Sequence, residues 1–136
     1  MYKNPVVHFE MPAEDKARMN KFYESAFGWE TRQLGPEMGE YVIVTTTETD
    51  ENRMVKTPGT INGGFYQKKK PDQYTRITIA VDDIQEAMKK VIEAGGTVVG
   101  GMQNPGQPDN IPGVGLYATF IDTEGNLASM LQPFNK

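Results

Sequence analysis

Apolar and polar residues follow the same order twice along this chain. In each half a short alternating stretch comes first, a stretch with helical periodicity follows, and further β-rich stretches come after it. Alternation predicts the first strand over residues 6–11, with apolar side chains on one side and the ionisable side chains of His8 and Glu10 on the other. The apolar side is expected to meet a helix, which leaves His8 and Glu10 together on the opposite side.

The first helix is predicted to begin near Glu14 or Asp15, because negative charges suit a helix N-terminus. It is predicted to end at Gly28, which is placed for a left-handed cap. Apolar side chains recur at helical spacing between these ends, and we interpret them as core packing. This apolar stripe consists of Met19, Phe22, Tyr23, Ala26 and Phe27.

The second helix is predicted to begin at Asp82, where Gln85 three residues later would complete a capping box, and to end at Gly95 and Gly96. Residues 104–113 contain three prolines and are predicted to form a loop able to cover a pocket. The remaining β-rich stretches predict strands over residues 29–34, 40–47, 60–67, 74–81, 97–102, 114–121 and 127–132.

The two halves align when one is moved along the other so that Arg76 falls on His8. Repeated units that cannot each bury their apolar face alone are expected to pack together. We therefore expect the sheets of the two halves to curve around a common hollow, with the helices outside. The glycine pair Gly63-Gly64 lies inside one predicted strand, where glycines often mark a bulge or a close approach by backbone or ligand.

Composition argues against several classes of function. The net charge of −4 and the lack of a basic face argue against nucleic-acid binding. No stretch is long and apolar enough to predict a membrane span. The absence of cysteine excludes disulfides, thiolate metal sites and cysteine nucleophiles. The first residues lack the pattern of a secretory signal, so a cytoplasmic location is expected.

Four stretches together resemble a known superfamily: VVHFEMPAEDKARMNKFYESAFGW, PGTINGGF, AVDDIQEAMKKVIEAGGTVV and IPGVGLYATFIDTEGN. They are similar to the vicinal oxygen chelate superfamily of glyoxalase I, bleomycin-resistance proteins and extradiol dioxygenases, and within it to poorly characterised glyoxalase-related bacterial proteins. The resemblance implies an α+β fold in which two βαβββ modules form a curved eight-stranded mixed sheet around a cavity, with helices outside. We expect one domain over residues 1–136, with modules at 1–67 and 74–136. The resemblance also implies a homodimer, which the open edges of such sheets favour.

Metal-dependent members of the superfamily hold a divalent metal with His or Glu at four positions facing the cavity. The resemblance places these positions at His8, Gly64, Arg76 and Ser129, so only His8 retains a usual ligand. Glycine offers no side chain, serine is a poor ligand unless ionised, and a guanidinium would repel the ion. No metal or other cofactor is therefore expected, although a divalent metal held by His8 with Glu10 stays an alternative.

Polar residues expected to face the cavity supply the candidate site. The predicted ligand-binding residues are His8, Asn62, Tyr66, Arg76, Thr78 and Ser129, and the candidate catalytic residues are His8 and Glu10. An arginine beside a histidine favours an anionic ligand, and a histidine near a carboxylate can act as a general base. The alternative is an internal network in which Glu10 pairs with Arg76 or with His8.

We therefore predict a protein that binds a small anionic organic molecule in the sheet cavity without the full metal site of the superfamily. One alternative is an enzyme: a metal-dependent or His8-based lyase or isomerase related to lactoylglutathione lyase. The other is a structural or regulatory protein whose cavity is collapsed.

Overall fold

The computed structural model describes residues 3–134, and the chain divides into two compact units. The first, here called the His8 unit, is His8–Thr75. The second, here called the Arg76 unit, joins the residues before His8 to the segment that begins at Arg76. Each unit is described by itself below.

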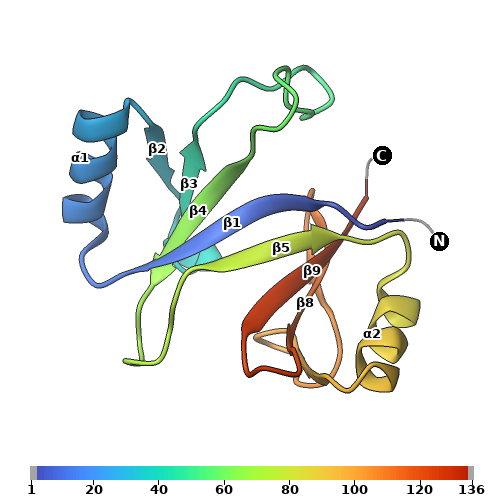
Figure 1. Cartoon of the computed structure of the whole chain (residues 1–136). Coiled ribbons are helices and arrows are strands. Elements are labelled where there is room, and N and C mark those ends of the chain that lie inside the picture. The colour runs from blue at the N-terminus through green and yellow to red at the C-terminus, as the bar shows by residue number, and fades with distance from the viewer. Residues whose placement is uncertain (1–2, 135–136) are drawn as a thin grey trace. The chain divides into compact units, whose positions relative to one another are not determined.

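The His8 unit contains one α-helix, a short 3-10 helix and a four-stranded mixed sheet (Figure 1). The strands lie in the order β2-β3-β4-β1; β1 and β4 are parallel, and the other neighbours are antiparallel. Its core is formed by Ala13, Val42, Val44 and Phe65, against which partly buried aromatic and apolar side chains pack. The elements are β1 (Val6–Ala13), α1 (Lys16–Phe27), β2 (Glu30–Gln33), the 3-10 helix η1 (Pro36–Met38), β3 (Val42–Thr45) and β4 (Asn62–Gln67).

Both ends of α1 lie where the sequence predicts them. The Asp15 carboxylate accepts a hydrogen bond from the Arg18 amide at 3.0 Å, which satisfies one of the free N–H groups at the helix start. At the other end Gly28 has a left-handed backbone with φ of 70°, and its N–H bonds back to the last turn. Local capping chemistry therefore determines where this helix begins and ends.

The prediction that the whole apolar stripe of α1 is core packing is wrong in part. Met19 and Tyr23 do pack against the core of the sheet. In contrast Phe22 and Phe27 are 57% and 64% exposed, and Ala26 is exposed as well. Successive helical residues turn by about 100°, which puts Phe22 and Phe27 on the two flanks of the stripe, where the sheet does not cover them.

The Arg76 unit repeats this arrangement. Its strands lie in the order β5-β9-β8-β6; β5 and β9 are parallel, β7 pairs with β8, and the remaining neighbours are antiparallel. The strand β7 was not predicted, because it lies inside the proline-rich segment interpreted as a loop. The buried core consists of Val81, Ile84, Met88, Ala118 and Met130. The elements are β5 (Arg76–Ala80), α2 (Ile84–Glu93), β6 (Thr97–Gly100), β7 (Asp109–Ile111), β8 (Gly115–Ile121) and β9 (Leu127–Pro133).

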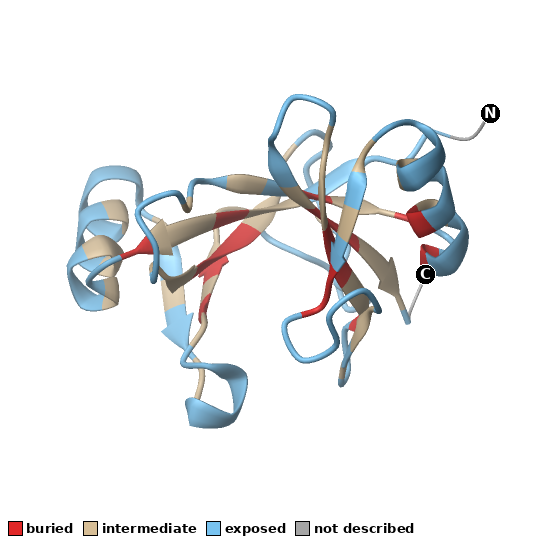
Figure 2. Ribbon diagram, turned by 90° about the horizontal axis from the view of Figure 1, so that it is seen from below, coloured by how far each residue is buried: buried red, intermediate tan, exposed pale blue. Residues whose placement is uncertain are grey.

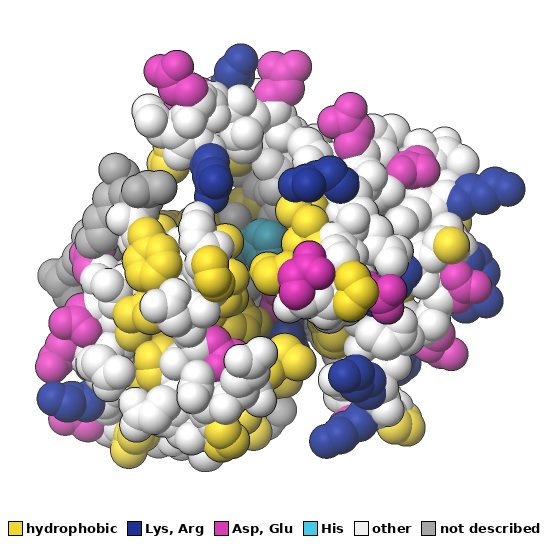
Figure 3. Space-filling model, turned by 180° about the vertical axis from the view of Figure 1, so that it is seen from behind, with side chains coloured by type: hydrophobic (Ala, Val, Ile, Leu, Met, Phe, Trp, Pro, Cys, Tyr) yellow, Lys and Arg dark blue, Asp and Glu magenta, His cyan; other side chains and the backbone are white. Residues whose placement is uncertain are grey.

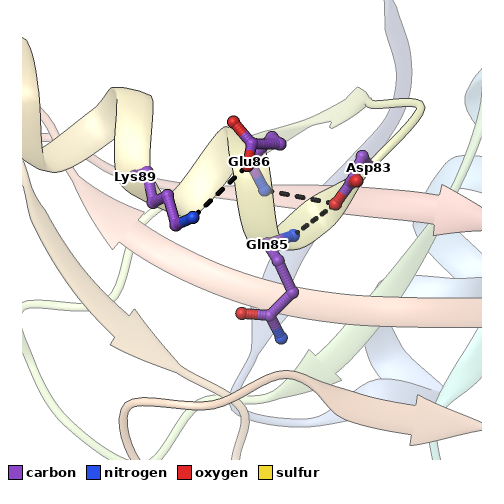
Figure 4. Close-up of polar contacts among 4 residues, drawn as sticks. All are labelled: Asp83, Gln85, Glu86 and Lys89. Carbon is purple, nitrogen blue, oxygen red and sulfur yellow. Dashed lines mark hydrogen bonds and ion pairs between the residues drawn. The ribbon is translucent and has the colours of Figure 1, made fainter.

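The predicted cap of α2 is wrong by one residue. The N-cap is Asp83, not Asp82, and its carboxylate accepts from the amides of Gln85 at 3.0 Å and Glu86 at 3.2 Å (Figure 4). Asp83 has an extended backbone directly before the first helical residue, the conformation that lets a short acidic side chain reach back to free N–H groups. Lys89 lies 3.4 Å from Glu86 on the exposed side of the first turns.

The predicted α+β fold class is confirmed, since both units have a strand, a helix and then further strands in a mixed sheet. Figure 2 shows the buried positions mainly on strands, while the helices are largely exposed. Figure 3 shows acidic and basic side chains interspersed on the face seen from behind rather than gathered by sign. Within residues 3–134 no helix has the length and apolar character needed to cross a membrane.

Candidate functional site

Strand β1 holds His8 and Glu10 on the face of its sheet that does not carry the core. Phe9, between them, packs against the core cluster of the His8 unit, so its two neighbours point the other way. In the parallel ladder with β4, His8 pairs with Asn62 and Glu10 pairs with Gly64. The strand period thus brings the two predicted catalytic residues to one polar face.

A tyrosine that the sequence analysis did not select joins these two side chains. Tyr41 stands directly before β3, and its hydroxyl lies 3.2 Å from His8 Nε2. The same hydroxyl donates a hydrogen bond to Glu10 Oε2 at 3.0 Å. Glu10 is buried, and His8 and Tyr41 are half-buried. We call these three residues the His8–Tyr41–Glu10 cluster.

The glycine pair in β4 makes room for an aromatic ring on each side of the sheet. A β-carbon on Gly63 would overlap the ring of Phe9 on the core side. A β-carbon on Gly64 would overlap the hydroxyl and ring of Tyr41 on the polar side. The sequence predicts a bulge or a close approach by backbone or ligand at these glycines, whereas the atoms that approach them are aromatic side chains of this chain.

The protonation of His8 is governed by its surroundings within the cluster. Burial lowers the pKa of His8 below its ordinary value of 6.5, because a buried imidazolium loses its hydration. The negative charge of Glu10 acts in the opposite direction and offsets part of this effect. The imidazole is therefore neutral at neutral pH, and a neutral imidazole can accept a proton or a hydrogen bond.

Two other predicted ligand-binding residues of this unit make contacts with the backbone. The side-chain oxygen of Asn62 accepts from the amides of Thr46 at 2.7 Å and Thr47 at 3.0 Å, which holds the segment after β3. The hydroxyl of Tyr66 donates to the carbonyl oxygen of Tyr74 at 2.9 Å. These contacts give both side chains a structural role, and their role in ligand binding stays a prediction.

The Arg76 unit brings Thr78 and Ser129 together. They are register partners in the parallel ladder of β5 and β9, and they are 2% and 0% exposed. The Ser129 hydroxyl lies 2.6 Å from the hydroxyl of Tyr117. The Thr78 hydroxyl has no hydrogen-bond partner within the described part of the chain. Arg76 is the first residue of β5, and the ligand-binding roles assigned to these residues stay predictions.

The two tyrosines extend the internal repeat beyond what the sequence alignment detected. In the Arg76 unit Tyr117 contacts Ser129, and Ser129 is the register partner of Thr78. In the His8 unit Tyr41 lies over Gly64, and Gly64 is the register partner of Glu10. The spacing of the two tyrosines differs from that between His8 and Arg76, so a single offset does not reveal it. The sequence carries no clear signal for Tyr41, because residues 41–45 read Tyr-Val-Ile-Val-Thr and do not alternate between polar and apolar.

The side chains at the four superfamily metal positions do not fit a divalent ion. The space beside Gly64 is occupied by Tyr41, and the Ser129 hydroxyl is engaged with Tyr117. Arg76 has a permanently charged guanidinium, which is not a metal ligand. Throughout residues 3–134 no group of three or more histidine, aspartate and glutamate side chains is placed to hold a metal. A catalytic metal normally needs about three protein ligands, so we derive no chemistry through one.

Two surface hollows lie away from these residues. One of about 250 Å³ is lined by residues of β2 and β3 in the His8 unit, including Arg32 and Ile43. The other, of about 530 Å³, lies in the Arg76 unit between α2 and β6, with Met88 and Thr97 in its wall. Neither wall includes a residue of the His8–Tyr41–Glu10 cluster.

Comparisons with known proteins bear on the chain as a whole. The family model described as Glyoxalase-like domain matches residues 7–131. A comparison with curated protein sequences finds no match.

Several solved structures share the fold. A variant of Streptomyces coelicolor methylmalonyl-CoA epimerase in complex with 2-nitronate-propionyl-CoA has 12% identity and a TM-score of 0.66, over 95% of this chain and 96% of that chain. A glyoxalase/bleomycin resistance protein/dioxygenase superfamily member from Vibrio splendidus 12B01 has 15% identity and a TM-score of 0.60, over 97% and 100%. A hypothetical protein from Bacillus halodurans C-125 has 13% identity and a TM-score of 0.66, over 99% and 98%. Together with the family match, these structures confirm the superfamily resemblance predicted from the motifs.

Proposed function

This chain belongs to the glyoxalase-like domain family, and from that premise we propose that it binds a small organic molecule at the His8–Tyr41–Glu10 cluster. The single observation that carries the proposal is the Tyr41 hydroxyl, which lies within hydrogen-bond distance of both His8 Nε2 and Glu10 Oε2. Three polar groups thus converge on the face of the sheet that the core does not use. Convergent polar groups of this kind orient ligands in binding sites.

The charge of the cluster favours an uncharged polar group on the ligand at this point. The His8 imidazole is neutral at neutral pH because burial lowers its pKa, and Glu10 carries the negative charge that acts on it. A carbonyl or hydroxyl group suits such surroundings better than a carboxylate does. The proposed anionic character of the ligand therefore depends on the guanidinium of Arg76, which can bind a carboxylate in a bidentate manner.

Ligands of the structural neighbours guide the choice of probe. One neighbour is a methylmalonyl-CoA epimerase in complex with methylmalonyl-CoA, with 13% identity and a TM-score of 0.67. Methylmalonyl-CoA presents carbonyl groups and a free carboxylate in one molecule, so it tests both parts of the proposal. Coenzyme A without the acyl group is the matched control.

The test uses His8 as its reporter, because His8 is the only histidine of the chain. Methylmalonyl-CoA is titrated into ¹⁵N-labelled protein while the imidazole and backbone amide signals are followed by NMR; the amide signals also report binding by His8→Ala, which has no imidazole. We expect saturable shifts that coenzyme A does not cause, and weaker binding after His8→Ala and after Arg76→Ala. Binding whose affinity is the same in the wild-type chain and both variants would refute the proposal.

A second candidate function is proton transfer next to a carbonyl, as in a lyase or isomerase. The observation that favours it is the lowered pKa of His8, which leaves the imidazole free to act as a general base at neutral pH. In this reaction a C–H bond next to the carbonyl breaks, its proton passes to the imidazole, and the electron pair moves to the carbonyl oxygen. Return of the proton to carbon completes an isomerisation.

Deuterium exchange tests this second function directly. Methylmalonyl-CoA is incubated with the protein in D₂O, and uptake of deuterium at the carbon between the two carbonyl groups is measured against the uncatalysed rate. We expect His8→Ala to abolish the enhancement and a metal chelator to leave it unchanged. Full exchange by the His8→Ala variant, or complete inhibition by the chelator, would refute a His8-based reaction.

A homodimer and a cytoplasmic location complete the proposal. The sheet of the His8 unit ends at β2 and that of the Arg76 unit at β6, and open strand edges favour pairing with a second chain. Light scattering is expected to give the mass of two chains, and the mass of one chain would exclude the dimer. If neither binding nor exchange is detected, the structural or regulatory alternative becomes the better account.

A further inference from the structure

We propose that Tyr41 is a positioning residue that keeps the proton of the neutral His8 imidazole on Nε2, so that Nδ1 is the nitrogen that accepts a proton or a hydrogen bond. This inference rests on the proposed function and deepens it, because it names the atom of His8 that acts. It also gives a role to a residue that the sequence motifs did not include.

The direction of the hydrogen bonds follows from what each group can donate. An ionised carboxylate can only accept, and a phenol has a single O–H to give. At 3.0 Å from Glu10 Oε2 the Tyr41 O–H is donated to the carboxylate. Only lone pairs of the Tyr41 oxygen then remain for His8 Nε2 at 3.2 Å, so that Nε2 must carry the hydrogen.

The other imidazole nitrogen is available for chemistry. Within residues 3–134 the His8 ring makes one hydrogen bond, from Nε2 to Tyr41, and Nδ1 makes no hydrogen bond. In a neutral imidazole one nitrogen donates and the other accepts. With Nε2 protonated, Nδ1 keeps the free lone pair that a general base or a hydrogen-bond acceptor needs.

The fold holds Tyr41 in place from several sides. Its carbonyl oxygen accepts from the Leu34 amide at 2.7 Å, and its own amide donates to Met38 at 3.3 Å. The next residue, Val42, is fully buried in the core. The ring lies in space that any side chain at Gly64 would fill. A group fixed by its own packing and by backbone bonds can impose an orientation on the group it contacts.

Tyr117 of the Arg76 unit shows which part of the role of Tyr41 is structural and which part is positioning. Tyr117 occupies the equivalent place and contacts Ser129, yet no histidine stands in that unit. The tyrosine is thus a feature of the repeated fold. In the His8 unit an imidazole and a carboxylate flank the hydroxyl of Tyr41, and this pair is what gives Tyr41 the proposed control over a proton.

The test is a direct measurement of the His8 tautomer by long-range ¹H–¹⁵N NMR on ¹⁵N-labelled wild-type protein, at a pH where the imidazole is neutral. Protonated and unprotonated ring nitrogens have well-separated ¹⁵N shifts, and a single histidine removes any ambiguity of assignment. We expect Nε2 to be protonated and Nδ1 to be unprotonated. A spectrum with the proton on Nδ1 would overturn the proposal.

Two variants test the cause of this tautomer. Tyr41→Phe removes the acceptor, and we expect the Nδ1-protonated form to rise several-fold. Glu10→Gln replaces a group that only accepts with an amide that can also donate, so that the Tyr41 O–H is released towards Nε2 and the tautomer ratio moves in the same direction. Tyr74→Phe is the matched control, since Tyr74 is 73% exposed, and we expect no change.

The outcomes distinguish this inference from the proposed function. The tautomer is measured without any ligand, so a failure to bind methylmalonyl-CoA leaves the result intact. An unchanged tautomer ratio in both Tyr41→Phe and Glu10→Gln would overturn the positioning role even if ligand binding is found. If Tyr41→Phe does not fold, the wild-type spectrum and Glu10→Gln still decide the question.

Discussion

Replacement of Gly64 by alanine probes the packing on which the His8–Tyr41–Glu10 cluster depends. The added β-carbon would overlap the hydroxyl and ring of Tyr41. Gly64 does not have a left-handed backbone, so alanine adds no strain of its own. The backbone of Tyr41 is held by hydrogen bonds on both sides. The ring therefore has to turn away, which removes its hydroxyl from His8 and Glu10.

The cost of Gly64→Ala is set by the contacts that Tyr41 loses. A hydrogen bond to a charged group contributes about 1.5–3 kcal/mol. Alanine regains roughly 0.5–1 kcal/mol over glycine through the lower entropy of the unfolded chain. The net loss in the free energy of unfolding is therefore about 1–2 kcal/mol. For a chain of 136 residues this corresponds to a fall in Tm of roughly 3–7 °C.

A double-mutant cycle with Tyr41→Ala isolates the overlap from other effects of the substitution. Urea unfolding followed by circular dichroism is measured for the wild type, both single variants and the double variant. In the Tyr41→Ala background the Gly64→Ala change is expected to cost nothing or to stabilise slightly, giving a coupling energy of about 1–3 kcal/mol. An equal loss in both backgrounds, or no loss in the wild-type background, would refute the account of the Gly64 packing.

Further predictions concern the protonation of His8, the core, the helix cap and metal content. Lowering the pH through 6.5 is expected to reduce the free energy of unfolding, because the folded-state pKa of His8 is depressed and the unfolded chain takes up the proton first. His8→Gln should remove this pH-dependent loss of stability, and equal pH slopes in the wild type and His8→Gln would contradict the prediction. Phe65→Ala deletes a fully buried ring and is expected to cost about 3–5 kcal/mol in urea unfolding, so a loss below about 1 kcal/mol would mean that the core packs differently. Asp83→Ala should lower stability by about 1 kcal/mol through loss of the α2 cap, whereas Asp72→Ala, in an exposed turn, should have little effect; equal losses would argue against the cap. Elemental analysis of the purified protein is expected to find no stoichiometric nickel or zinc, and one metal ion per chain would overturn the argument from the side chains at the superfamily positions.

Much of the fold was predictable because its causes are local. The α1 boundaries at Asp15 and Gly28 follow from capping chemistry that acts within one helical turn. The repeated order of strand, helix and strands follows from hydrophobic periodicity. The errors arose where two local signals competed or where packing decided. Both Asp82 and Asp83 are able to cap a helix, and only the backbone conformation selects Asp83.

The tertiary structure decided which part of each apolar pattern is covered. The sequence presents Phe22 and Tyr23 as members of one stripe, but the sheet covers Tyr23 and leaves Phe22 exposed. Coverage depends on the position of the neighbouring strands, which no periodicity within the helix encodes.

The candidate site divides in the same way. The sequence by itself placed His8 and Glu10 on one side of β1, because side chains alternate along a strand. It also marked the Gly63-Gly64 pair as a bulge or a close approach by backbone or ligand. It did not bring Tyr41 to them. That contact needs β3 beside β4 and β4 beside β1 in one particular register. Register is settled by the hydrogen-bonded ladder and by burial of the shared core, and both exist only once the chain has folded.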